Sequence, residues 1–63
     1  MTKEAWIEAV YQELNRRFGA PANETETRNM REWASAMADG DDSLYADGFS
    51  PADAVQEEIW AAS

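Results

Sequence analysis

The chain contains neither cysteine nor histidine, and this limits most strongly how its 63 residues can fold. A domain of about this length buries only about 60% of the surface of its unfolded chain, so its stability is usually marginal. Without cysteine there is no disulfide and no thiolate metal site, and without histidine the commonest transition-metal ligand is also missing. The remaining source of stability is a helical core, which self-association can extend.

Three tryptophans supply much of the material for such a core, one in each predicted helix. Each aromatic side chain can bury roughly 150–250 Å². This content argues against disorder despite a net charge of −8. We expect Trp6 and Trp33 to lie in the core. Trp60 lies beside the core stripe of its helix and fits a core or an interface position equally well.

Capping residues and apolar residues at helical spacing predict three helices. The predicted helices span residues 3–18, 24–38 and 51–62. Their predicted N-caps are Thr2, Asn23 and Ser50. Gly19 is a natural stop for the first helix, and Pro51 suits the first turn of the third.

The apolar residues of each helix predict which face turns inward. The expected core residues of the first helix are Ile7, Val10, Tyr11, Leu14 and Phe18, with Trp6 at the edge. Those of the second are Met30, Trp33, Ala34 and Met37, and those of the third are Ala52, Val55, Ile59 and Ala62. Between the second and third helices, residues 43–46 are expected to form a short helical turn, with Leu44, Tyr45 and Phe49 closing the core. The sequence therefore predicts an all-α fold, with residues 1–63 as a single helical domain: a small three-helix bundle with an additional short helical turn.

Charge is concentrated near the end of the sequence. Residues 39–63 contain seven acidic residues and no lysine or arginine. Because affinity for phosphate groups comes from lysine and arginine, this disfavours direct binding to nucleic acid or anionic lipid. It favours a basic protein surface as the partner.

The aspartates of this region do not match a calcium loop. An EF-hand needs glycine at position six and glutamate at position twelve, and counting from Asp39 these positions hold Leu44 and Ser50. The carboxylates lie in predicted loops or on polar helix faces, and a chain this small has little room for a pocket of roughly 300–1,000 Å³. We predict no catalytic residue, no metal ligand and no cofactor.

Targeting features are also missing from the sequence. No apolar run approaches the roughly 20 residues of a membrane span, and the first residues do not form a basic-then-apolar signal peptide. We expect a protein of the cytoplasm, with no membrane partner.

The segment from Asp47 to Glu58 (Asp-Gly-Phe-Ser-Pro-Ala-Asp-Ala-Val-Gln-Glu-Glu) resembles a helix start common in short phage-borne helical proteins. It covers 12 of the 63 residues. In size, acidity and lack of cysteine, the chain also resembles the small acidic anti-CRISPR proteins encoded by bacteriophages. This resemblance implies an inhibitor that acts in a bacterial host cell and occupies a basic, nucleic-acid-binding surface of a CRISPR effector complex.

The leading functional hypothesis is a non-catalytic, protein-binding inhibitor whose acids mimic nucleic-acid phosphates or pair with basic side chains of a CRISPR effector subunit. The candidate partner-binding residues are Asp41, Asp42, Tyr45, Asp47, Asp53, Glu57, Glu58 and Trp60. Tyr45 and Trp60 are the candidate apolar anchors. Two alternatives stay open: a homo-oligomeric assembly module, such as a homodimer, and an antitoxin or regulatory adaptor that binds a basic protein.

Overall fold

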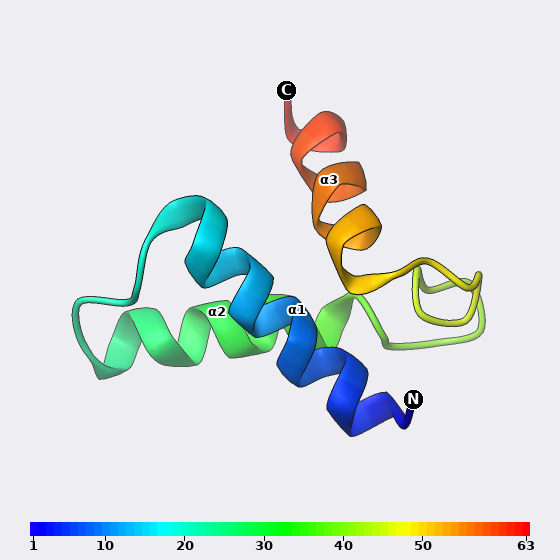
Figure 1. Ribbon diagram of the computed structural model, residues 1–63, viewed down its shortest axis with the longest axis horizontal. Helices are drawn as coiled ribbons and strands as arrows, with labels where there is room; N and C mark the ends of the chain where they lie inside the picture. The colour runs from blue at the N-terminus through cyan, green and yellow to red at the C-terminus, as the bar shows by residue number, and fades with distance from the viewer.

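The computed structural model describes residues 1–63, which form three α-helices and no strand. The helices are α1 (Lys3–Phe18), α2 (Glu24–Ala36) and α3 (Pro51–Ala62). α1 packs against both of the others, and the last turns of α3 point away from this pair (Figure 1). The all-α, three-helix prediction is confirmed. None of the helices is both long and apolar enough to cross a membrane.

Each helix begins at its predicted cap. The side-chain oxygens of Thr2, Asn23 and Ser50 each accept a hydrogen bond from the backbone N–H three residues later. These bonds satisfy N–H groups that have no partner within the helix. In α2 the carboxylate of Glu26 also accepts a hydrogen bond from the Ala22 N–H, at 3.3 Å, which ties the preceding connection to the first turn.

The C-terminal ends of the helices agree only in part with the predicted ends. α1 stops at Gly19, whose φ of 90° requires a residue without Cβ and whose N–H donates to the Asn15 carbonyl at 2.8 Å. α2 ends at Ala36, two residues before the predicted end. There the Ala38 N–H donates to the Ser35 carbonyl, three residues back, so the helix tightens into a 3₁₀-type turn.

The connection between α2 and α3 contains the predicted helical turn. The Asp47 N–H donates to the Ser43 carbonyl at 3.0 Å, which is one α-helical hydrogen bond without further helix. Ser43 is buried, and its hydroxyl oxygen accepts a hydrogen bond from the Ala46 N–H at 3.1 Å. Leu44, Tyr45 and Phe49 are half-buried and pack against the core, as expected.

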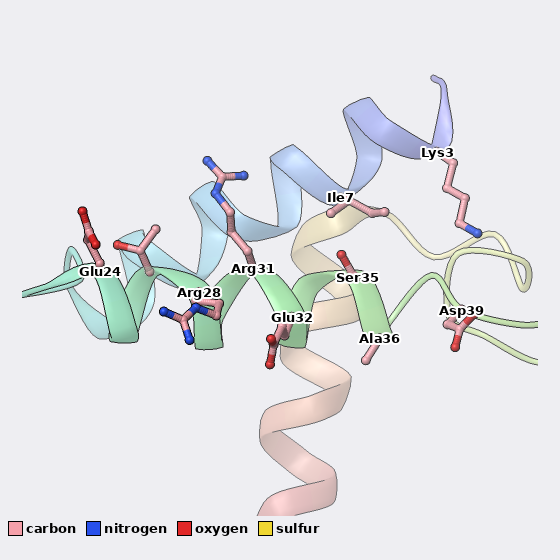
Figure 2. A pocket seen from close by; sticks show the side chains of 10 residues that line it. Lys3, Ile7, Glu24, Arg28, Arg31, Glu32, Ser35, Ala36 and Asp39 are labelled. Atoms are coloured by element: carbon pink, nitrogen blue, oxygen red, sulfur yellow. The ribbon is translucent and has the colours of Figure 1, made fainter.

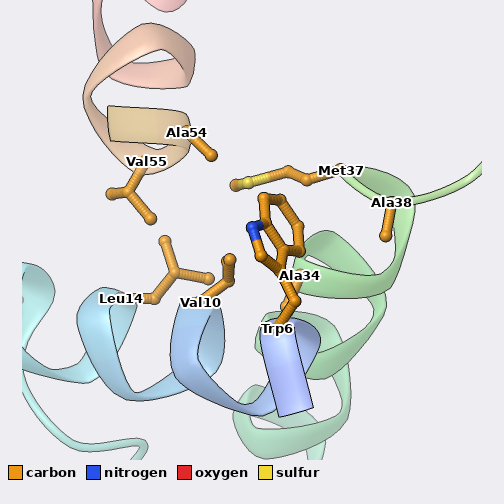
Figure 3. Packing of buried hydrophobic residues seen from close by; sticks show 8 residues of the cluster. All are labelled: Trp6, Val10, Leu14, Ala34, Met37, Ala38, Ala54 and Val55. Carbon is orange, nitrogen blue, oxygen red and sulfur yellow. The ribbon is translucent and has the colours of Figure 1, made fainter. Parts of the chain in front are cut away.

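The core lies where α1 meets the end of α2 and the start of α3 (Figure 3). Its buried residues are Trp6, Val10, Leu14, Ala34, Met37, Ala38, Ala54 and Val55. Trp6, expected at the edge of the α1 stripe, is a buried member of this cluster, and only 4% of it is exposed. Its indole Nε1–H donates to the Phe49 carbonyl at 2.9 Å, which holds the residue before the α3 cap against α1.

The expected core stripes of α1 and α2 are wrong at Phe18 and Trp33, which are 58% and 37% exposed. Their rings lie against each other at the surface, with centroids 5.8 Å apart. The buried positions of α1 are spaced by four residues, and each such step turns about 40° around the helix. Phe18 has therefore rotated away from the core by the last turn.

The expected stripe of α3 is also partly wrong. Ala54 and Val55 are buried and Ile59 is half-buried, but Ala52 and Ala62 are exposed. The first turns of α3 contact α1, and the helix then diverges from it (Figure 1). Ala62 lies on the same side of α3 as Val55 by helical spacing, but it belongs to the last turn, where α3 has left the other helices (Figure 1).

Candidate protein-binding surface

The five basic residues all precede residue 39, and three of them are already engaged within the chain. Arg16 and Arg17 pair with Glu13, and Arg31 pairs with Glu8. Arg28 and Glu32 lie four residues apart on α2, but neither forms a salt bridge in the structure. The first two helices thus neutralise part of their own charge.

Glu13 is the centre of a junction between α1 and α3. Its Oε2 accepts a hydrogen bond from Arg17 Nε at 2.8 Å, and Arg17 Nη1 donates to Gln56 Oε1 at 2.7 Å. Hydrogen bonds from Arg16 and then Arg17 lower the pKa of Glu13 to about 2. This carboxylate therefore holds Arg17 in place to meet α3.

A second arrangement joins α1 to α2. Arg31 Nη1 donates to Glu8 Oε2 at 2.7 Å, and the guanidinium carbon lies 4.0 Å from the centre of the Tyr11 ring. The hydrogen bond from Arg31 lowers the pKa of Glu8, and the same bond raises the pKa of Arg31. One arginine side chain thus contacts a carboxylate and an aromatic face of the same helix.

In residues 39–63, none of the seven acidic side chains forms a salt bridge. Asp41, Asp42 and Asp47 are exposed in the connection before α3, Asp53 and Glu57 are exposed on α3, and Glu58 is half-buried. This negative charge faces solvent without an internal partner.

The two candidate aromatic anchors differ in their surroundings. Tyr45 is half-buried, and its ring meets that of Trp6 edge-on, with centroids 5.4 Å apart. Trp60 is 66% exposed. Part of the Tyr45 ring is therefore already used in the fold, whereas the Trp60 ring is free to contact a partner.

The structure divides the predicted site residues into two groups. At 100° per residue, Asp53, Glu57 and Trp60 share the face of α3 opposite Val55. The connection with Asp41, Asp42 and Asp47 leads into the first turn of α3, where Asp53 lies (Figure 1). Because α3 spans roughly 18 Å, Trp60 lies near the opposite end of the helix. The face of α3 that carries Asp53, Glu57 and Trp60 is called the α3 outer face below.

The sequence did not predict an open hollow of about 850 Å³ between α1 and α2. Its volume lies in the range that we expected this chain to be too small to contain. Side chains of both charge signs line it, among them Lys3, Arg28, Glu32 and Asp39, and they point in different directions rather than toward one point (Figure 2). Nowhere in residues 1–63 do three acidic side chains gather as a metal site would need.

Comparison with known proteins gives no match to a protein-family model, a curated protein or a solved structure.

Proposed function

We propose that this chain is a non-catalytic binding protein that recognises a basic protein surface through residues 39–63. The observation that carries the proposal is that all seven acids of this segment are without a salt bridge, while every cation of the chain precedes them. Unneutralised surface charge of one sign attracts a partner of the opposite sign and raises the rate of encounter.

The α3 outer face supports this proposal because it combines charge with an apolar anchor. Asp53 and Glu57 lie one turn apart, and the exposed Trp60 follows within another turn. Tryptophan is enriched among the residues that contribute most to the affinity of interfaces. The carboxylates would steer and orient the partner, and the buried indole would supply much of the affinity.

We further propose a CRISPR effector subunit in a bacterial host cell as the partner, on the resemblance to anti-CRISPR proteins. A surface of such a subunit that binds nucleic acid is rich in lysine and arginine. Carboxylates spaced along a helix and a loop can occupy that surface and exclude the nucleic acid. In this proposal the protein inhibits by competition and changes no covalent bond.

Charge reversal tests the mechanism. We expect the triple variant Asp53→Lys, Glu57→Lys and Glu58→Lys to lose at least about tenfold in affinity for the effector subunit, since it replaces attraction with repulsion. The matched control is the variant Glu4→Lys, Glu24→Lys and Glu32→Lys, which has the same net charge. Calorimetric titration at two salt concentrations measures the affinity of both variants, and circular dichroism checks that both are folded. Equal losses in the two variants would show that only the net charge matters.

A second candidate function is self-assembly, and the exposed pair Phe18 and Trp33 favours it. Two adjacent aromatic rings on the surface are a common feature of interfaces between subunits. Sedimentation equilibrium at high micromolar concentration tests it: a dimer that Trp33→Ser dissociates supports assembly, and a monomeric mass excludes it under those conditions.

A further inference from the structure

An acidic residue followed three positions later by an aromatic residue occurs on two helices of this protein. On α1 the pair is Glu8 and Tyr11, and on α3 it is Glu57 and Trp60. Side chains three residues apart on a helix are neighbours, with Cβ atoms about 5–6 Å apart. Asp42 and Tyr45 have the same spacing but lie outside the helices, where the Tyr45 ring meets Trp6.

The α1 pair is filled by an arginine of the same chain. The guanidinium group of Arg31 donates to Glu8 Oε2 at 2.7 Å and lies over the Tyr11 ring at 4.0 Å from its centre. A planar guanidinium can do both because its N–H groups lie in its plane while its face stays free to stack. This contact shows that a carboxylate and a ring at this spacing can bind a guanidinium group.

The α3 pair is empty. Glu57 is exposed and forms no salt bridge, and Trp60 is 66% exposed. No lysine or arginine occurs in residues 39–63 to fill it from nearby in the sequence. Tryptophan is also a better partner for a cation than tyrosine, so the empty pair is the stronger of the two acceptors.

We propose that Glu57 and Trp60 form a binding site for an arginine side chain of a basic protein partner. The guanidinium face stacks on the indole, and its N–H groups donate to the Glu57 carboxylate. Asp53, one turn earlier on the α3 outer face, adds a second acceptor for a neighbouring base. The inference rests on the proposed function and goes beyond it by naming the residue that is recognised: arginine rather than lysine, because the ammonium group is strongly hydrated and not planar.

Peptides of nine arginines and of nine lysines test this preference by calorimetric titration of the whole chain. We expect the arginine peptide to bind more tightly. Trp60→Leu should weaken binding of the arginine peptide about two- to fivefold and that of the lysine peptide less. Glu57→Gln should weaken both, since either cation pairs with the carboxylate. The matched control is Trp60→Phe, which keeps an aromatic ring at this position and should retain most of the preference for the arginine peptide.

The outcomes separate this inference from the function on which it rests. If the two peptides bind equally, or if Trp60→Leu weakens both alike, the arginine site is wrong while charge-based binding stands. If charge reversal of Asp53, Glu57 and Glu58 leaves peptide binding unchanged, the proposed function itself fails. If the wild type dimerises and Trp60→Leu abolishes the dimer, Trp60 belongs to an interface between two copies of this chain, and the arginine site for another protein is wrong.

Discussion

Trp6 illustrates what a single residue contributes to this fold. Its ring is buried among residues from all three helices, it meets Tyr45 edge-on, and its N–H bonds to a carbonyl 43 residues away. Helical spacing predicted a core residue at the edge of the α1 stripe. Its hydrogen bond to the Phe49 carbonyl was not predictable, because the bond depends on where the connection before α3 passes.

Trp6→Phe should lower the free energy of unfolding by about 2–3 kcal/mol. The change removes the donor of the part-buried hydrogen bond to the Phe49 carbonyl and leaves a space beside Tyr45. Urea denaturation monitored by circular dichroism measures this loss of stability. Trp33→Phe is the matched control and should cost less than about 1 kcal/mol, since Trp33 is partly in solvent. Similar losses in both variants would mean that the bond to Phe49 contributes little.

The helices themselves were largely predictable because their signals are local. The capping side chains accept hydrogen bonds from N–H groups only three residues away, so both partners can be recognised in a short stretch of sequence. These capping residues are Thr2, Asn23 and Ser50. The inward face was less predictable, as Phe18 and Ala52 show, because it depends on the crossing point and angle of a neighbouring helix. The same limit applies to the site. The exposed acids were predictable, whereas the exposure of Trp60 depends on which face of α3 packs against α1, and the sequence left that open for this residue.

Glu13→Gln should remove a pH-dependent part of the stability. A carboxyl whose pKa falls from 4.5 to about 2 on folding stabilises the folded state above pH 4.5, and this contribution is lost as the pH falls toward 2. The difference in unfolding free energy between wild type and variant should therefore be largest near pH 6 and shrink steadily between pH 4.5 and 2. Urea titrations across this range measure it. The matched control is Glu32→Gln, which removes an acid without a salt bridge. If the difference for Glu13→Gln depended on pH no more than that for Glu32→Gln, the junction would be contradicted.

At the scale of the whole molecule, charge is separated along the chain. Two helices contain every cation and several ion pairs, and the last 25 residues contain only acids, none of them salt-bridged. Like charges repel one another and destabilise the folded state. The arrangement therefore reduces stability in the segment that we propose for binding, and a basic partner would relieve that repulsion.

Salt should for this reason stabilise the free protein. Raising sodium chloride from 0.02 to 0.5 M shortens the screening length to a few ångströms, which we expect to raise stability by about 0.5–1 kcal/mol. For a chain of this length, that is a rise of several degrees in the melting temperature. Thermal unfolding monitored by circular dichroism measures it, and the triple lysine variant of α3 should respond less. A fall in melting temperature would show that the ion pairs of α1 and α2 dominate instead.

The three tryptophans lie in three different environments, and each belongs to a different helix. Trp6 is shielded from solvent, Trp33 is partly covered by Phe18, and Trp60 is largely in water. Their fluorescence should therefore differ in emission wavelength and in accessibility to a soluble quencher. In variants that keep one tryptophan at a time, the fluorescence of Trp6 would report the packing of the core. The fluorescence of Trp60 would report the binding of a partner to α3.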